Sequence, residues 1–323
     1  MLSIYQLMKY LRNTHHINVK SSQTQDLRNM GYYHGFKGYR FIREDTNRVN
    51  FNSLDEVIAL NKYDMQLKTV LYPKVMFIEN ALKSYVIEAL LMDSKSENFD
   101  VIYNKSLTAY RNHTPGSRAY KTEYTKRMNL KGKINAALIR NYNKRSVVAH
   151  FFNKDITIPI WAIFETLTLG EFGTLYDCAC TNVKRYVSNI MKLPTNLDSD
   201  GMNTQFFIFT VKDLRNAIAH NNVIFDTRFK TGKIDQRLIT LLESEIGISN
   251  IDFKYMDAYV IMITYFLRKM GETKTACRQF VVSYQQQTEY LRSELPINIY
   301  NQIIGTQHRP NMNAIQNFIS RYQ

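Results

Sequence analysis

Apolar residues recur at intervals of three and four along most of the chain, which is the spacing of one buried helical face. Ser53 and Glu56 have the spacing of a capping box, so a long helix is predicted to begin there. Its apolar face consists of Leu60, Leu67, Leu71, Val75, Ile78, Leu82 and Val86. Pro73 lies inside this run and is expected to kink or divide the helix, because proline offers no amide hydrogen.

Shorter helices are predicted on both sides of the long one. The segments are residues 3–12, 159–170, 173–191, 250–270 and 273–291. Proline at the start and glycine at the end define the helix from Pro159 to Gly170. Asn250 is expected to cap the helix that follows it.

No strand-rich region emerges, so the expected fold class is mainly α. Segment 31–43 is turn-rich, aromatic and basic, and it predicts a small hairpin or loop. The domains expected are a small N-terminal helical and aromatic unit over 1–52, a helical domain over 53–245 with a basic insertion at 101–145, and a C-terminal helical extension over 246–323.

The chain has 323 residues, of which 45% are hydrophobic, enough for one large domain or two modest ones. Its 42 basic and 28 acidic residues give a net charge of +14. Residues 101–145, the basic segment, hold eleven lysines and arginines and a single acid, Glu123. Charges of one sign repel one another in the absence of a polyanion, and no strong apolar face accompanies them. This balance favours nucleic acid over a membrane as the partner.

The side chains expected to bind RNA lie mainly in the basic segment. They are Lys121, Lys126, Arg127, Lys131, Lys133, Arg140, Lys144 and Arg145, with Lys37 and Arg40 from segment 31–43. The aromatic residues Tyr32, Tyr33, Phe36 and Tyr39 are interpreted as core residues. The alternative is a platform on which RNA bases stack.

Three cysteines form no disulfide framework, because Cys178 and Cys180 are two apart inside a helical pattern and point away from each other. The chain is therefore expected to be cytoplasmic. No spacing of histidine, cysteine and carboxylate resembles a metal site, so neither a metal nor a cofactor is expected. The longest apolar stretch contains Asp257 and is too short to cross a membrane.

One helix carries candidate chemistry at its end. Its buried stripe is predicted to be Phe207, Val211, Leu214 and Ile218. Asn216 and His220 are four apart and share a face, and the long side chain of Arg215 reaches toward a group held near the imidazole. A histidine can take the proton from a 2′-hydroxyl or protonate the leaving 5′-oxygen, and an arginine can grip the phosphate.

The same Arg-x4-His spacing recurs at Arg145 and His150, so the spacing alone proves nothing. The structural alternative is that His220 is a helix-terminal residue favoured by the helix dipole, with Asn221 and Asn222 ending the helix. Asn216 is expected to orient His220. Arg145 and His150 are interpreted as RNA-binding residues or as packing near Trp161.

The order of several motifs resembles the Abi-like proteins of bacterial abortive infection, the AbiD/AbiF group of the HEPN superfamily. These motifs are Gly31-Tyr32-Tyr33 with Gly38-Tyr39, Leu60-x-x-x-Asp64-x-x-Leu67-Lys68, Ile78-Glu79-x-Ala81-Leu82-Lys83-Ser84, Ile160-Trp161 through Leu167-Thr168-x-Gly170, and Leu214-Arg215-Asn216-x-x-Ala219-His220. Leu7-Met8-Lys9-Tyr10-Leu11 precedes them, and the resemblance covers roughly residues 1–230.

The resemblance implies a HEPN-type helical bundle whose nuclease motif is Arg215, Asn216 and His220. It also implies a role in defence or as a toxin, a structured noncoding RNA as antitoxin or target, and a homodimer in which two motifs share one cleft. Glu79 and Lys83 are candidates for supporting the motif, and the alternative is an ordinary surface pair at i,i+4.

The function expected is that of a metal-independent endoribonuclease that leaves 2′,3′-cyclic phosphate ends and is restrained or guided by an RNA. One alternative is a non-catalytic RNA-binding protein that acts by sequestration. Another is a DNA-binding regulator that uses the basic segment to read a duplex.

Overall fold

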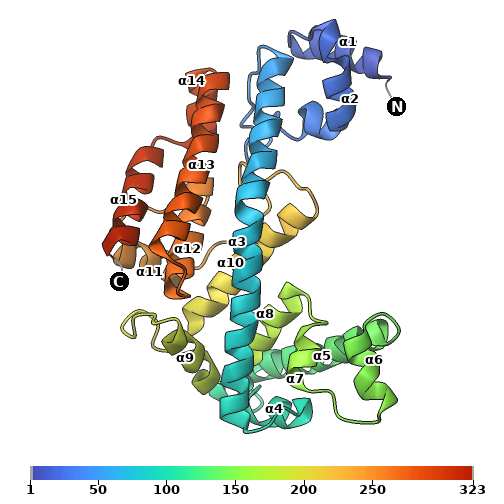
Figure 1. Ribbon diagram of the computed structural model, residues 1–323, viewed down its shortest axis with the longest axis vertical. Coiled ribbons are helices and arrows are strands. Elements are labelled where there is room, and N and C mark those ends of the chain that lie inside the picture. Colours follow the sequence, from blue (N-terminus) through green and yellow to red (C-terminus); the bar gives the residue numbers. More distant parts are fainter. Residues whose placement is uncertain (1–2, 322–323) are drawn as a thin grey trace. The chain divides into compact units, whose positions relative to one another are not determined.

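The structure is a computed structural model that describes residues 3–321, and these residues are mainly helical (Figure 1). Fifteen α-helices and no strand occur in the described part, which confirms the expected fold class. The helices form two compact units. The first unit contains the chain up to Val75, Asp213–Ile234 and the chain from Leu242 onward, and the second contains Met76–Lys212 and Asp235–Leu241. The three-part division expected from the sequence stays a prediction.

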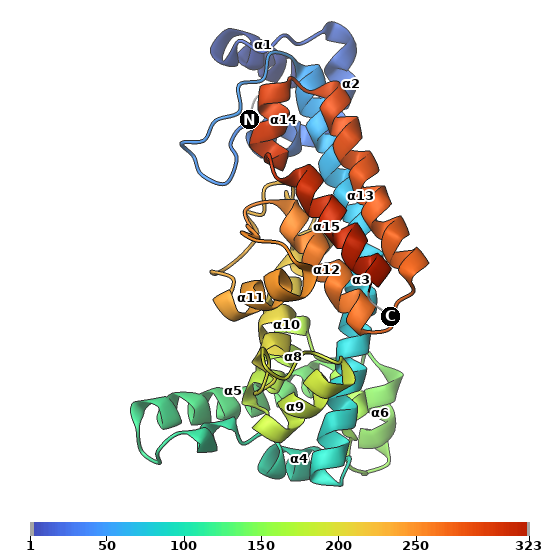
Figure 2. The same cartoon turned by 90° about the vertical axis from the view of Figure 1, so that its left-hand side faces the viewer.

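The first unit begins with α1 (Ile4–His15), which packs on α2 (Thr24–Tyr32). Its C-terminal helices are α12 (Met256–Lys269), α13 (Lys274–Glu294), α14 (Ile297–Ile304) and α15 (His308–Arg321). Helices α12, α13 and α15 lie side by side in both ribbon views (Figures 1 and 2). Every residue of α12 is buried, including the polar residues Asp257, Thr264, Arg268 and Lys269.

Asn250 does not cap α12. The helix begins at Met256, with Tyr255 at the N-cap, and Asn250 instead turns the chain with a left-handed φ of 64°. The loop between them buries Ile251 and Phe253, so apolar residues in this stretch belong to the core without being helical.

Helix α3 (Leu54–Ser94) is one uninterrupted helix, and its residues up to Val75 belong to the first unit. Of the two effects expected of Pro73, a division of the helix is wrong, because α3 continues through this proline, and a kink stays a prediction. The predicted capping box also differs in detail. Glu56 accepts a hydrogen bond of 2.8 Å from the backbone N–H of Asn52, one residue before Ser53.

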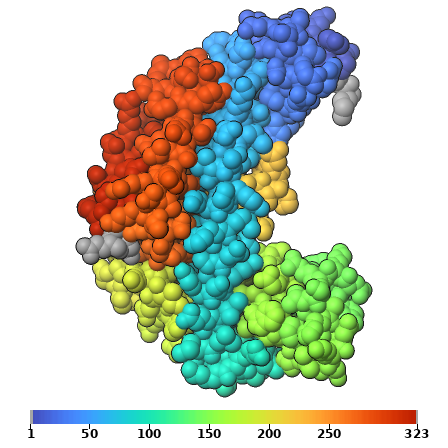
Figure 3. All heavy atoms as spheres, in the orientation of Figure 1, coloured from blue at the N-terminus to red at the C-terminus, as the bar shows by residue number. Residues whose placement is uncertain are grey.

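The first half of α3 is covered by the C-terminal helices, which form a continuous surface with it in the space-filling view (Figure 3). Tyr63 of α3 is fully buried next to Asp257 and Tyr284. Lys74 pairs with Glu272 at 3.6 Å. These contacts join a helix near the start of the chain to helices near its end.

The second unit contains several shorter helices. They are α4 (Phe99–Lys105), α5 (Arg118–Tyr142), α6 (Ser146–Asn153), α7 (Ile160–Phe164), α8 (Leu169–Cys178) and α9 (Thr181–Ile190). Of these, α6 and α8 pack on α5. Pro159 is the N-cap of α7, but Gly170 does not close that helix. Thr168 caps a new helix there, because its side chain and that of Glu171 form a capping box.

The helix expected over 173–191 is two helices, since the chain is extended at Ala179 and Cys180 between α8 and α9. Cys178 and Cys180 therefore flank a break and do not share one helix. The helix expected over 273–291 is confirmed as α13, with the side chain of Thr273 accepting from the N–H of Ala276.

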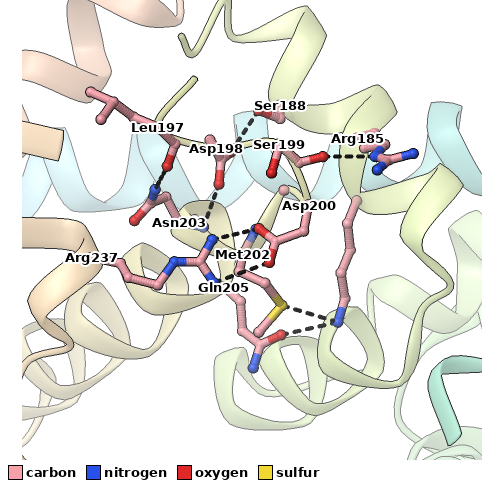
Figure 4. Close-up of polar contacts among 12 residues, drawn as sticks. Arg185, Ser188, Leu197, Asp198, Ser199, Asp200, Met202, Asn203, Gln205 and Arg237 are labelled. Carbon is pink, nitrogen blue, oxygen red and sulfur yellow. Dashed lines mark hydrogen bonds and ion pairs between the residues drawn. The ribbon is translucent and has the colours of Figure 1, made fainter. Parts of the chain in front are cut away.

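Helices α10 (Met202–Ala219) and α11 (Gln236–Ile246) contribute residues to both units. Carboxylates hold the first turn of α10 (Figure 4). Asp198 accepts from the N–H of Asn203 at 2.8 Å, and Asp200 accepts from the N–H of Met202 at 3.1 Å. Asp200 also forms a two-pronged ion pair with Arg237 of α11. Because the first amides of a helix lack partners within it, these acceptors fix where α10 begins.

Segment 31–43 differs from the predicted hairpin or loop, because its residues up to Lys37 are helical and only the rest is a loop. Gly31 breaks the α2 helix with a φ of 69°, and Tyr33–Lys37 form one wide helical turn. The chain then closes a loop with a single antiparallel bridge between Phe41 and Arg48. Over the described residues, no helix has both the length and the apolar character that membrane crossing needs.

Candidate active site

The motif helix α10 buries the stripe that its sequence predicts, with one change. Phe207, Val211 and Leu214 are buried. Ile218 is only partly buried, and Ala217 completes the stripe instead. The helix is therefore buried on one side as far as Ala217, whereas Ala219 and His220 are exposed to solvent.

The helix ends at the histidine of the motif. Asn221 has a left-handed φ of 52°, and the N–H of Asn222 donates to the carbonyl of Ala217 at 2.8 Å. This confirms Asn221 as the residue that ends the helix. The N–H of His220 still donates to the carbonyl of Asn216 at 3.0 Å, so the backbone of His220 belongs to the last helical turn. Its imidazole is exposed.

Arg215 and Asn216 contact each other at this end of the helix. Nη1 of Arg215 donates to Oδ1 of Asn216 at 3.2 Å, and both side chains are partly exposed. Asn216 was expected to orient His220, whereas its amide oxygen holds the guanidinium. The three motif residues thus present a cation, an amide and an imidazole at one exposed helix terminus.

A buried ion pair of α3 holds the chain directly after the motif. Oδ1 of Asp64 accepts from the N–H groups of Ile224 and Phe225 at 2.7 and 2.9 Å. Lys68 Nζ lies 2.8 Å from Oδ2 of Asp64 and donates to Oδ1 of Asn221 at 2.8 Å. Both charges are almost completely buried and are paired with each other. The Asp64–Lys68 pair therefore fixes the chain one to five residues beyond His220.

His34 joins the same neighbourhood. Burial lowers the pKa of His34, and the charge of Lys68 lowers it further, while Asp64 acts in the opposite direction. Gly38 lies against the post-motif segment, because a Cβ at this position would be 3.1 Å from Cγ2 of Val223. Segment 31–43 therefore packs beside the residues that follow the motif. The sequence pattern offered no signal for this proximity, since nearly 190 residues separate Gly38 from Val223.

Glu79 and Lys83 form the predicted i,i+4 pair on α3, with Nζ and Oε1 2.9 Å apart. Glu79 is only 4% exposed, so the pair is not an ordinary surface pair. Both residues belong to the second unit, whereas Arg215, Asn216 and His220 belong to the first. Their support of the motif stays a prediction. Across residues 3–321, no three or more histidine, cysteine, aspartate or glutamate side chains are grouped to hold a metal ion.

The basic segment divides into internally bonded and exposed cations. Arg127 is 5% exposed, and its guanidinium donates to the carbonyl of Tyr103 and lies 3.6 Å from the centre of that ring. Lys126 bonds to Glu123 and Asp177 at 2.8 and 2.6 Å. Arg127 is therefore a structural cation, and Lys126 is largely neutralised.

Two more of the predicted RNA-binding residues are also bonded within the protein. Lys131 pairs with Asp100 at 2.7 Å, and Arg145 donates to the carbonyl of Glu165 at 2.6 Å. Asp100 and Asp177 lie outside residues 101–145, so the charge count over that window missed them. The exposed members of the basic segment that form no ion pair or hydrogen bond named above are Lys121, Lys133, Arg140 and Lys144. Arg145 is exposed as well, and so is Lys37 of segment 31–43.

The second Arg-x4-His occurrence lies near Trp161, as one of its two interpretations expected. Arg145 precedes α6, and Phe151, next to His150, packs edge-on against Trp161 with ring centres 5.7 Å apart. Nη1 of Arg145 lies 4.0 Å from Oε2 of Glu165, and both Arg145 and His150 are exposed. Whether these two residues bind RNA stays a prediction.

The fold and this terminus define a helical protein with an Arg-Asn-x-x-x-His motif. The chain belongs to the Abi-like protein family, whose match covers residues 25–226. The matched region includes the Asp64–Lys68 pair, Glu79, Lys83 and the whole motif. This membership points to abortive infection, a bacterial defence against phage. No curated protein and no solved structure matches the chain.

Proposed function

We propose that the protein is a metal-independent endoribonuclease of abortive infection, with Arg215, Asn216 and His220 as its catalytic residues. The observation that carries the proposal is the last part of α10, where the guanidinium of Arg215 is held by Asn216 and the exposed His220 follows at the helix end. A buried ion pair fixes the chain just after them, which is the preorganisation that a catalytic group requires.

In the proposed reaction, the 2′-oxygen of a nucleotide attacks the adjacent phosphorus and the bond from phosphorus to the 5′-oxygen breaks. His220 accepts the 2′-hydroxyl proton or protonates the leaving 5′-oxygen. Arg215 neutralises the charge that develops on the phosphate. The products are a 2′,3′-cyclic phosphate and a 5′-hydroxyl.

The partner is RNA, and a structured noncoding RNA restrains or guides the activity. Only one motif per chain occupies an exposed helix terminus of this kind in the described residues, so a homodimer would supply two motifs to one cleft. The exposed lysines and arginines of the basic segment supply phosphate contacts.

The test is incubation of purified protein with total RNA in EDTA, with analysis of the ends. We expect cleavage that leaves 2′,3′-cyclic phosphate, and its loss in His220→Ala and in Arg215→Ala. Both variants should keep the parent's melting temperature within a few degrees, because neither side chain is in the core. His150→Ala is the matched control and should cleave like the parent.

Products with 3′-hydroxyl ends, or activity that requires a divalent ion, would contradict the proposed chemistry. Tight RNA binding by the parent without any cleavage would support sequestration instead.

A further inference from the structure

A basic hollow of about 360 Å³ opens in the first unit. Five of its lining residues come from one stretch of chain, Tyr33, Lys37, Arg40, Phe41 and Arg43, and Arg228 adds a wall from the post-motif segment. The volume falls within the range of pockets that hold small ligands.

Buried hydrogen bonds build this hollow. Oδ2 of Asp226, a residue with no solvent exposure, accepts from the N–H of Arg43 at 2.7 Å. The same carboxylate holds the guanidinium of Arg228 at 2.6 to 2.9 Å, and Nη2 of Arg228 donates to the carbonyl of Phe41 at 2.5 Å. The walls are thus fixed before any ligand arrives.

The hollow carries excess positive charge. Asp226 neutralises Arg228, and the guanidinium of Arg43 donates to the carbonyl of Lys254 at 3.0 Å and lies 4.7 Å from the centre of the Tyr255 ring. Lys37 and Arg40 form no ion pair among the described residues, and Asp45 is the only acid in the lining. Burial, with the charges of Lys254 and Arg43, lowers the pKa of the neighbouring Lys230 even though Asp252 opposes this. An anion of two or more charges would relieve this repulsion.

One wall is an exposed aromatic ring. Tyr33 is 49% exposed, whereas Phe36 and Tyr39 from the same stretch are buried. The guanidinium of Arg40 lies 4.3 Å from the centre of the Phe41 ring, and an arginine can hold a phosphate with two hydrogen bonds. An exposed ring beside cations is the arrangement that binds an unpaired base together with its phosphate.

We infer that this hollow binds a single nucleotide unit, with the base on Tyr33 and the phosphate held by Lys37 and Arg40. The inference rests on the proposed function for its RNA source, because the hollow shares a wall with the segment that follows His220. A nucleotide within an RNA chain and a free nucleoside phosphate offer the same chemistry, so both are tested.

The experiment measures binding in the His220→Ala background, so that cleavage cannot obscure it. The probes are a fluorescent single-stranded RNA and adenosine 5′-monophosphate. Tyr33→Ala should weaken RNA binding by roughly 10-fold, the typical value of one base stacked on an aromatic ring. Lys37→Ala with Arg40→Ala should weaken binding and lower its dependence on salt.

Matched controls separate this site from general charge and aromaticity. Tyr32→Ala removes a neighbouring tyrosine that is 40% exposed and does not line the hollow. Lys9→Ala with Lys62→Ala removes two exposed cations of the same unit. Both controls should bind RNA like the parent, and all variants should melt at the parent's temperature.

If adenosine 5′-monophosphate binds and Tyr33→Ala abolishes this, the hollow also accepts free nucleotides. If only RNA responds to the variants, its occupant is a nucleotide within a chain. Equal RNA affinity for Tyr33→Ala and Tyr32→Ala, or equal losses for the two double variants, overturns the inference. Neither outcome depends on whether the protein cleaves RNA.

Discussion

Arg127 and Arg215 are both arginines on helices, yet their surroundings give them different roles. Arg127 is buried, and its guanidinium contacts the ring and the carbonyl of Tyr103. Arg215 is partly exposed at a helix end, where Asn216 holds its guanidinium. Sequence cannot separate the two, because burial depends on contacts with distant residues. Charge alone is therefore a poor guide to RNA binding in this protein.

Replacing Arg127 with alanine should lower the free energy of unfolding by about 2–4 kcal/mol. The loss combines a desolvated cation–π contact with hydrogen bonds from a charged donor. Urea unfolding measures it. Arg140→Ala is the control, since this exposed side chain should cost less than about 0.5 kcal/mol. Equal stability of the two variants would contradict a structural role for Arg127.

The cysteines should be unreactive in the folded protein. Burial raises the pKa of Cys178 to about 12 and that of Cys277 to about 11, and it also raises the pKa of Cys180. Thiolate is the reactive form, so at mildly alkaline pH a colorimetric disulfide reagent should react slowly with the native chain.

Full reaction should appear on unfolding in guanidinium. Because the pKa values are raised in the folded state, any stability that the protonated thiols contribute is lost as pH rises through those values. Rapid native reaction of all three thiols would show that these helices open frequently.

At the scale of elements, the helices were largely predictable and their ends were not. The periodic stripes of α3, α10 and α13 could be read from the chain because apolar spacing reports a buried face directly. Pro73 failed as a divider, since tertiary burial on both sides of it outweighs the loss of one hydrogen bond. Gly170 failed as a terminator, because the Thr168–Glu171 capping box begins a helix around it.

The candidate site was predictable only in part. The motif residues and their helix followed from spacing and from the order of the family's motifs. The residues that hold the segment after the motif could not be predicted. Asp64, His34 and Val223 come together only in the folded chain, and no sequence period indicates that they do. The spacing of Asp64 and Lys68 indicates an i,i+4 pair. It does not indicate that the pair is buried against a loop 160 residues away.

The Asp64–Lys68 pair should be essential for stability. Lys68→Met keeps the length of the side chain but leaves the Asp64 carboxylate buried without its cation. The cost should be about 3–5 kcal/mol by thermal or urea unfolding. Replacing both residues, as Asp64→Asn with Lys68→Met, should cost less than Lys68→Met alone, because no unpaired charge remains.

The control is Lys62→Met, which changes an exposed lysine of the same helix and should leave stability unchanged. A single variant more stable than the double variant would contradict this account.

At the scale of the whole molecule, the net charge is +14, but several of the basic side chains are bonded to groups within the protein. Lys126, Lys131 and Arg127 are bonded to neighbouring groups, whereas Lys121, Lys133, Arg140 and Lys144 point to solvent. RNA binding through the basic segment should therefore depend on the exposed set.

Alanine at Lys121, Lys133, Arg140 and Lys144 together should weaken RNA binding and flatten its dependence on salt. Each lost phosphate contact should reduce the slope of log affinity against log salt by roughly 0.7 to 0.9. Filter binding over a salt series measures this. The comparison is Lys126→Ala with Lys131→Ala, which should change the slope little because these charges are already paired. A larger effect from the paired residues would place the RNA elsewhere.

The contacts of Asp64 and Lys68 with the chain beyond His220 also bear on how the proposed ribonuclease activity would be controlled. A binding partner would not need to block the proposed catalytic groups. Loosening one turn of α3 from residues 221–225 would release the end of α10 and leave the imidazole without a fixed position. A partner that does this would switch the proposed activity off from a distance, and restoring the same contacts would switch it on again without new protein.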